Sequence, residues 1–190
     1  QDAKTHLQTA LGDKSDEGIA LDEIGIAVTK INARKVIKEL TTLLGEEKVY
    51  TEYVDDPDKV PQTDKQVIIA SGYKPGVTTD YCMMKIAENA NADMAIKVSN
   101  FPIVLNVKPT EFDSAKLSEY EQLSSMVWDE ITELVGEKSI PGGNYPLDPP
   151  AAHLGKKLAT QNDFVLYIGM NSELEGMLRG SEFKGTTVRN

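Results

Sequence analysis

VIIASGYKPGVTTD, residues Val67–Asp80, is the stretch that decides the fold class. Its first four residues form an unbroken apolar run, which is typical of a buried strand. The glycines at 72 and 76 mark a loop over Ser71–Thr78, and a helical pattern follows over Thr79–Asn89. The side chains predicted on the inner side of that helix are Cys82, Met83, Ile86 and Ala87. A strand, a glycine-containing loop and a helix in this order predict an α/β protein with a mainly parallel sheet.

The same alternation continues on the C-terminal side. The predicted strands are Asp93–Val98, Phe164–Ile168 and Thr186–Val188, and Ser99–Pro109 is predicted as a loop with some extended backbone. A capping box of Ser118 and Glu121 predicts a helix that carries Leu123, Val127, Ile131 and Leu134. A second glycine-rich loop over Gly142–Pro149 leads into a helix capped by Asp148, and Ser172 with Glu175 predicts a last, short helix.

One long helix dominates the N-terminal side. Apolar residues recur at intervals of three and four from Ile24 to Leu44, with Asp22 near the predicted start and Gly45 just after the end. Before this helix we predict a short helix over Asp2–Leu11 and a polar turn over Asp13–Gly18. After it we predict a short strand, Val49–Val54, and an acidic loop, Asp55–Asp64.

Composition and charge exclude several classes of function. The formal net charge is −10 and no run of lysines and arginines forms a basic stripe, so no nucleic-acid partner is expected. A single cysteine, Cys82, excludes an internal disulfide, and no apolar run is long enough to span a membrane. We therefore expect a cytoplasmic protein without a membrane partner, folded as a single domain over residues 1–190.

The residues that often bind metals are scattered. His6 and His153 each stand without a second ligand at metal-binding spacing. Asp55, Asp56 and Asp58 lack the glycine and the twelfth-position glutamate of a calcium loop. No protein-bound metal site is predicted.

The loop Ser71–Asp80 has the composition of an anion site. Its glycines allow a close approach of the backbone, Lys74 supplies a positive charge, and Thr78 and Thr79 supply hydroxyls where the next helix begins. In open α/β sheets, ligands bind at such loops after the carboxyl ends of strands. The alternative is that Thr79 and Asp80 only cap the helix and Gly76 only turns the chain. A P-loop kinase is excluded because no GxxxxGK[ST] motif occurs.

A collinear series of five segments resembles uridylate kinases of the archaeal type, within the amino-acid-kinase superfamily. The segments are DEIGIAVTKINA at 22–33, PGVTTD at 75–80 after its strand, Ser99–Asn100, YPLDPPAAHL at 145–154 and GSEFKGTTV at 180–188. Together they cover nearly the whole chain. The resemblance implies a three-layer αβα sandwich with a mainly parallel sheet. It also implies transfer of the γ-phosphoryl group of ATP to UMP with Mg²⁺, and a homo-oligomer, usually a hexamer.

The resemblance assigns an acceptor site to the first half of the chain. Asp22 would hold the ribose of UMP. The residues that would line the UMP site and its phosphate are Tyr73, Lys74, Pro75, Gly76, Val77, Thr78 and Thr79. No residue is assigned a catalytic role.

The ATP side matches the family less closely. Lys4 falls where the family has an arginine, and a lysine cannot form the bidentate fork of a guanidinium. Ser99 and Asn100 keep the hydroxyl and the amide of the family's Thr–Asn pair. Leu105 replaces a tyrosine on the adenine side, and Lys108 replaces an aspartate. Loss of an aromatic ring and reversal of a charge are expected to weaken or reshape purine binding.

The family's first strand, which brings a lysine and a glycine-rich turn, and a later glycine triplet have no counterpart ahead of Gln1. Phosphoryl transfer depends on positioning and on neutralising charge. We therefore expect the sheet to lack its first one or two strands and this chain to transfer phosphate poorly. The alternative function is a non-catalytic relative that binds a nucleotide or another anion in a regulatory or assembly role.

Overall fold

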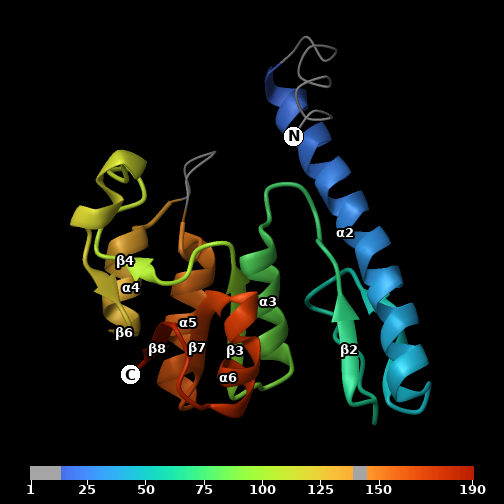
Figure 1. Cartoon of the computed structure of the whole chain (residues 1–190). Coiled ribbons are helices and arrows are strands. Elements are labelled where there is room, and N and C mark those ends of the chain that lie inside the picture. Colours follow the sequence, from blue (N-terminus) through green and yellow to red (C-terminus); the bar gives the residue numbers. More distant parts are fainter. Residues whose placement is uncertain (1–13, 139–144) are drawn as a thin grey trace. The chain divides into compact units, whose positions relative to one another are not determined.

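The computed structural model describes residues 14–138 and 145–190 (Figure 1). The predicted helix over residues 2–11 and part of the predicted loop over 142–149 lie outside the described residues. The chain divides into two compact units, Gln1–Cys82 (unit 1) and Met83–Asn190 (unit 2), with the boundary inside helix α3, Thr79–Asn89. The single-domain organisation stays a prediction.

Unit 1 consists of a long helix against a two-stranded sheet. Helix α2 spans Lys14–Leu44, and strands β1, Val49–Val54, and β2, Val67–Ala70, pair in parallel. The helix ends where predicted, because Gly45 adopts a positive φ of 92° and donates its N–H to Thr41 O at 3.0 Å. The core between helix and sheet is formed by Ala33, Ile37, Val49 and Val54, all buried.

Two sequence predictions about unit 1 are wrong. Helix α2 begins at Lys14, so the predicted turn over residues 13–18 is mostly helical and Asp22 lies two turns inside the helix. Gly18 suggested a turn, but one glycine costs a helix only about 1 kcal/mol, which its other residues offset. Strand β2 is half-buried and Ala70 is exposed, since the sheet has only two strands.

Unit 2 is built on a four-stranded sheet in the order β3-β7-β8-β6. Its strands are β3 (Met94–Ser99), β6 (Ser125–Val127), β7 (Val165–Met170) and β8 (Gly185–Arg189). A two-stranded antiparallel ladder, β4 (Val104–Leu105) with β5 (Gln122–Leu123), flanks a 3₁₀ segment, η1 (Ser114–Glu119). The helical elements are α4 (Trp128–Val135), α5 (Pro149–Gln161), η2 (Asn171–Glu173) and α6 (Leu174–Arg179). The β3–β7 and β6–β8 pairs are parallel, and β7–β8 is antiparallel.

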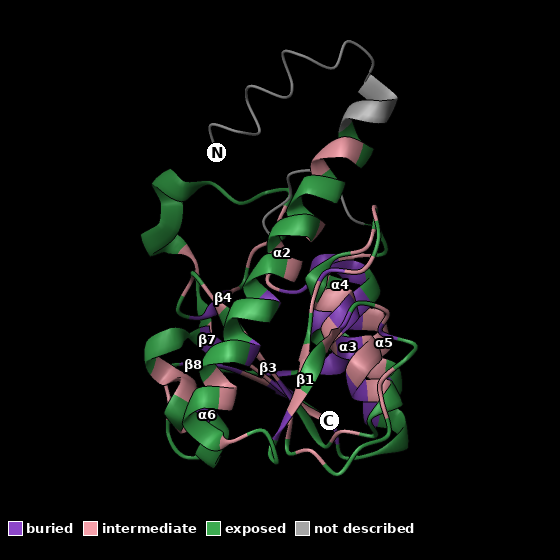
Figure 2. Cartoon of the chain, turned by 90° about the vertical axis from the view of Figure 1, so that its right-hand side faces the viewer, coloured by how far each residue is buried: buried purple, intermediate pink, exposed green. Residues whose placement is uncertain are grey.

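Helices cover both faces of this sheet, which gives unit 2 three layers (Figure 2). One face carries α4, α5 and the end of α3, and the other carries α6. Gly169 of β7 lies against Met177 of α6, where an added Cβ would come within 3.2 Å of Sδ. The main core fills the first face and is centred on Trp128, Phe164, Leu166 and Ile168, which are almost completely buried.

Two predicted helix starts in unit 2 are wrong. The Ser118–Glu121 capping box does not form; Ser118 lies in η1, and α4 begins only at Trp128, with Glu130 accepting the N–H of Val127 at 2.8 Å. The residues before α4 instead form β5 and β6, because pairing with β4 and β8 outweighs their helical spacing. Helix α6 is preceded by Glu173, and no side chain caps it.

Most other predicted elements of the described chain are confirmed. The bounds of β1, β2 and α3 agree with prediction, and β3, β7 and β8 differ by one or two residues. Asp148 caps α5 by accepting the N–H of Ala151 at 3.2 Å, ahead of Pro149. Cys82 and Ala87 are buried as predicted, while Met83 and Ile86 are half-buried and Met84 is the most buried residue of α3. Among the helices of the described residues, none is long and apolar enough to cross a membrane.

Candidate functional site

The loop between β2 and α3, residues 71–78, is fastened to α2 at two points. The N–H of Gly72 donates to Thr29 Oγ1 at 2.8 Å, and the N–H of Gly76 donates to Asp22 Oδ2 at 2.8 Å. Gly76 has a positive φ of 78°, so it does turn the chain, as one reading of the sequence held. The structure therefore brings Asp22 into contact with the predicted anion loop.

The hydroxyl of Thr78 caps the start of α3 by accepting the N–H of Tyr81 at 3.1 Å. The alternative reading placed the cap at Thr79 or Asp80, one or two residues too late. With the cap at Thr78, the loop leads directly into the N-terminus of an 11-residue helix, which attracts anions through its N–H groups and dipole.

Lys74 brings a positive charge to this loop. Its Nζ lies 4.8 Å from the centre of the Tyr73 ring, a cation–π contact that leaves the lysine exposed. Gly76, Thr78 and Thr79 are exposed as well, while Tyr73, Pro75 and Val77 are half-buried. The loop thus offers solvent a cation, two hydroxyls and a helix N-terminus, a set of groups that can bind a phosphate.

The predicted ATP-side residues of the described chain lie in unit 2, and two of them, Ser99 and Asn100, lie at the carboxyl end of β3. Ser99 is the last residue of β3 and pairs in register with Met170, the last residue of β7. Asn100 follows and is exposed; Leu105 is half-buried in β4, and Lys108 is exposed beyond it. Lys4 lies outside the described residues.

Sequence reasoning missed residues that gather at the same edge of this sheet. Because β8 runs antiparallel to β7, the start of β8 lies beside the carboxyl end of β7, with Gly185 opposite Gly169. A cavity of about 510 Å³ opens there, lined by Ile103, Ser124, Glu173, Glu182, Phe183, Lys184 and Gly185. The antiparallel direction of β8, which creates this arrangement, has no signal in the sequence.

The sequence predicted Thr186 only as a strand residue and did not indicate the role of its hydroxyl. Its side chain is completely buried, accepts the N–H of Val104 at 2.9 Å and donates to Leu123 O at 2.6 Å. One hydroxyl therefore ties the β4–β5 ladder to β8 and fixes the backbone that carries Leu105.

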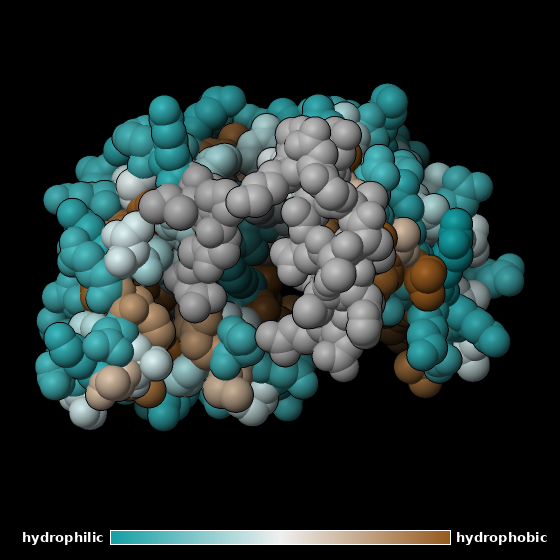
Figure 3. Space-filling model, turned by 90° about the horizontal axis from the view of Figure 1, so that it is seen from above, coloured by the Kyte–Doolittle hydropathy of each residue, from teal (hydrophilic) through white to brown (hydrophobic). Residues whose placement is uncertain are grey.

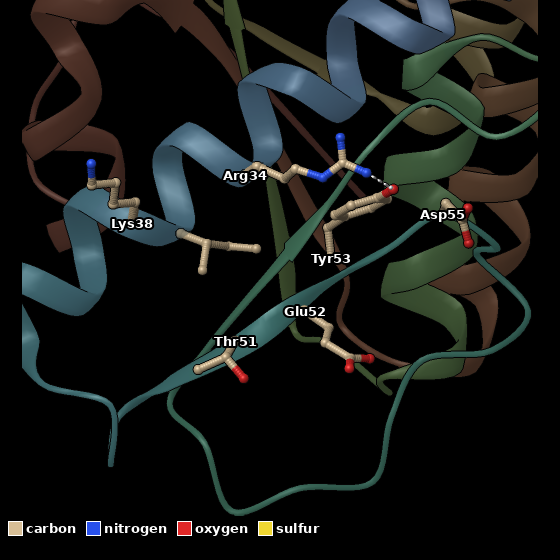
Figure 4. Close-up of a pocket in the computed structure, with 7 residues that line it drawn as sticks. Arg34, Lys38, Thr51, Glu52, Tyr53 and Asp55 are labelled. Carbon is tan, nitrogen blue, oxygen red and sulfur yellow. Dashed lines mark hydrogen bonds between the residues drawn. The ribbon is translucent and has the colours of Figure 1, made fainter.

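A second cavity, of about 560 Å³, lies between α2 and β1 in unit 1 (Figure 4). Arg34 points across it, with its guanidinium 5.1 Å from the centre of the Tyr53 ring and Nη2 3.1 Å from the Tyr53 hydroxyl. The remaining lining residues are Ile37, Lys38, Thr51, Glu52 and Asp55. The register of β1 against β2 shifts between Val49 and Tyr53, an irregularity that leaves Thr51 and Glu52 exposed.

The acidic loop after β1 makes one ion pair with helix α2 and one within itself. Asp55 pairs with Lys30 at 2.8 Å, and Asp56 pairs with Lys59 at 2.9 Å. The hydrogen bond from Lys59 lowers the pKa of Asp56, and the same bond raises the pKa of Lys59. These contacts fit the predicted role of a solvated acidic loop.

No group of three His, Cys, Asp or Glu side chains within residues 14–138 and 145–190 is arranged to hold a metal ion. Nε2 of His153 lies 3.5 Å from Glu137 Oε2 but makes no hydrogen bond to any described residue. His6 lies outside the described residues.

Comparison with known proteins gives a consistent result. No protein-family model matches the chain. Among curated proteins, the uridylate kinase of Haloquadratum walsbyi is 31% identical over 187 residues, covering 98% of this chain and 73% of that protein. The uridylate kinase of Sulfolobus acidocaldarius is 28% identical over 175 residues, covering 88% of this chain and 71% of that protein.

Solved structures show the same fold. The uridylate kinase of Archaeoglobus fulgidus matches with a TM-score of 0.66 at 21% identity, over 98% of this chain and 79% of that one. A UMP kinase from Bacillus anthracis matches with a TM-score of 0.67 at 18% identity, over 97% of this chain and 73% of that one. These matches confirm the predicted α/β fold class.

Proposed function

The chain belongs to the uridylate kinase family, and we propose that it transfers the γ-phosphoryl group of ATP to UMP, giving UDP and ADP. The observation that carries this proposal is the contact between Asp22 and the glycine loop at the N-terminus of α3. It joins a carboxylate, which can accept hydrogen bonds from ribose hydroxyls, to backbone and side-chain groups that can bind a phosphate. A nucleoside monophosphate presents both partners on one molecule.

On the acceptor side we assign the ribose to Asp22. Its Oδ2 already accepts the N–H of Gly76, and the side chain is exposed. The phosphate and the rest of UMP are assigned to the predicted loop residues Tyr73, Lys74, Pro75, Gly76, Val77, Thr78 and Thr79. Lys74 supplies the charge that a phosphate needs on a chain with a net charge of −10.

On the donor side we assign ATP to Ser99 and Asn100 at the carboxyl end of β3, with Lys4, Leu105 and Lys108 as the further predicted contacts. Ligands of open α/β sheets bind beyond the carboxyl ends of strands, and both Ser99 and Asn100 lie there. Leu105 offers an apolar surface in place of an aromatic ring, and Lys108 a positive charge that suits a phosphate.

Mg²⁺ enters this proposal as part of the substrate. Kinases take ATP as its magnesium complex, in which the ion bridges phosphate oxygens and neutralises charge. Within the described residues no carboxylate cluster forms a cage for the ion, so we derive no step through it.

We further propose a homo-oligomer in the cytoplasm. The support for assembly is helix α2, whose Ile24, Val28 and Ile31 follow one face at helical spacing and are all exposed. Figure 3 shows apolar residues in several places among hydrophilic ones on the face that it draws. The support for the cytoplasm is the single cysteine, Cys82, which is buried as a core residue.

The test is to incubate the chain with Mg–ATP and UMP and to separate the nucleotides by anion-exchange chromatography. We expect UDP and ADP in equal amounts and at a low rate, in keeping with the weak transfer predicted from the sequence, and a marked rise in the KM for UMP in Asp22→Ala. No UDP above a protein-free control would refute the kinase assignment.

The second candidate function is a non-catalytic nucleotide binder, favoured by Leu105 and Lys108. Thermal unfolding separates the two, because a ligand at about 100 times its Kd stabilises a protein by about 2.7 kcal/mol. A rise in Tm with UMP together with UDP formation supports the kinase. The same rise without UDP supports the binder, and no rise with UMP or ATP excludes both.

A further inference from the structure

Helix α2 holds both ends of the acceptor loop, residues 72–76, through side chains seven residues apart. Thr29 accepts the N–H of Gly72, and Asp22 accepts the N–H of Gly76. Seven residues are close to two full turns, so both side chains lie on the same face of α2, about 10 Å apart along its axis. Four residues of extended chain reach about 14 Å at most. The chain between the two attachments is therefore not much longer than the distance that it spans, which restricts the conformations of the loop.

Thr29 is itself fixed. Its Oγ1 donates to Ile26 O at 2.7 Å, so the hydroxyl hydrogen is already used in a hydrogen bond, and a lone pair of the oxygen accepts the N–H of Gly72. The attachment is also tight: a Cβ on Gly72 would come within 3.0 Å of Thr29 Oγ1 and 3.3 Å of Ile26 Cγ1. Gly72 is buried, so its N–H has no water to replace Thr29.

We propose that Thr29 is a positioning residue for the acceptor site. It fixes the beginning of the loop on α2, and this places the N–H of Gly76 at Asp22 and the exposed groups of the loop where they bind the acceptor. Thr29 does not touch the acceptor itself. The proposal rests on the proposed function for the identity of the acceptor, UMP, but the loop attachment is testable without it.

The experiment compares Thr29→Val, which keeps the shape and removes the hydroxyl, with Thr29→Ser, which keeps the hydroxyl. Thr42→Val is the matched control, because Thr42 also donates to the backbone of α2, at Lys38 O, but lies far along the helix from Thr29 and from the loop attachments. UMP affinity is measured by calorimetry and loop attachment by amide hydrogen exchange at Gly72 and Gly76.

In Thr29→Val we expect faster exchange at both glycines and a UMP Kd higher by about fivefold, the size of one lost hydrogen bond. Thr29→Ser and Thr42→Val should keep the wild-type Kd. In the kinase assay the KM for UMP should rise in Thr29→Val while the KM for ATP stays constant.

Two results would overturn the proposal. One is a Thr29→Val variant that binds UMP as the wild type does, even with a lower Tm, because Thr29 would then serve stability alone. The other is unchanged exchange at Gly72 and Gly76. If the wild type binds no UMP, the proposed function fails, and the exchange data still decide whether Thr29 positions the loop.

Discussion

Gly155 of α5 lies against Trp128 so closely that one methyl group should destabilise unit 2. A Cβ at this position would come within 3.0 Å of Cζ3 and Cη2 of the indole, closer than real Cβ contacts. Trp128 is 1% exposed, is stacked on Phe164 at a centroid distance of 6.0 Å and donates Nε1–H to Phe164 O at 3.4 Å. The ring therefore has little room to move away.

Two opposing effects set the size of the change in Gly155→Ala. Replacing glycine by alanine inside a helix stabilises it by about 1 kcal/mol. Overpacking a core costs about 1–3 kcal/mol, and the short distance to a fixed ring places this site near the upper end. We expect a net loss of about 2 kcal/mol, which at a urea m-value of about 2 kcal/mol/M lowers the unfolding midpoint by about 1 M.

Trp128 is the only tryptophan in the sequence, so its fluorescence reports urea unfolding of this core directly. Gly25→Ala in α2 is the control, measured by circular dichroism, because apart from its own turn of helix none of the described residues comes within 4 Å of its added Cβ, and the variant should gain stability. In a Trp128→Phe background, which lacks the clashing ring atoms, Gly155→Ala should cost much less. A Gly155→Ala chain as stable as the wild type would refute the reasoning, as would an equal cost in both backgrounds.

Further predictions concern ion pairing and capping. Hydrogen bonds from Lys157 and Lys85, both at 2.7 Å, lower the pKa of Glu88. The ionised Glu88 therefore stabilises the fold fully above its unfolded-state pKa of about 4.3. This stabilisation is lost as the pH falls through the lowered folded-state pKa. Glu88→Gln should lower the free energy of unfolding by about 1 kcal/mol at pH 7, and the difference from wild type should vanish once the pH lies below the lowered folded-state pKa of Glu88, measured by urea titration. Asp148→Ala should lose about 1 kcal/mol through its cap on α5, whereas Asp148→Asn should lose little, in the same titration.

The sequence predicted the elements that local chemistry determines. The strands β1, β2 and β7, the Gly45 end of α2 and the Asp148 cap of α5 were all predicted, because each depends on residues adjacent in the chain. The wrongly predicted helix start at Ser118 shows where prediction from neighbouring residues fails. Residues 122–127 have helical spacing, yet they form strands that pair with β4 and β8, and the residue opposite Ser125 is Thr187, 62 positions further along the chain.

In the candidate site, too, residues of one segment could be predicted from the sequence, whereas contacts between distant segments could not. The glycines, Lys74 and the threonines of the loop were predicted from composition, since such groups can bind a phosphate, and their role in binding stays a prediction. Asp22 was predicted from a resemblance and was placed at the wrong part of its helix. Thr29 was missed, because a threonine inside a helix gives no sign that its oxygen accepts an N–H from residue 72.

The position of the loop and the contacts that it makes depend on different residues. Both attachments to α2 use backbone N–H groups of glycines, so they depend on Thr29 and Asp22 and not on the side chains at 73, 74 or 77. Substitutions at those three positions can therefore change what the loop contacts without moving it. By the same reasoning, a substitution at Thr29 is expected to move every loop side chain at once. In the proposed acceptor site, Thr29 and Asp22 of α2 thus set the position of the loop, and the side chains at 73, 74 and 77 set what the loop contacts.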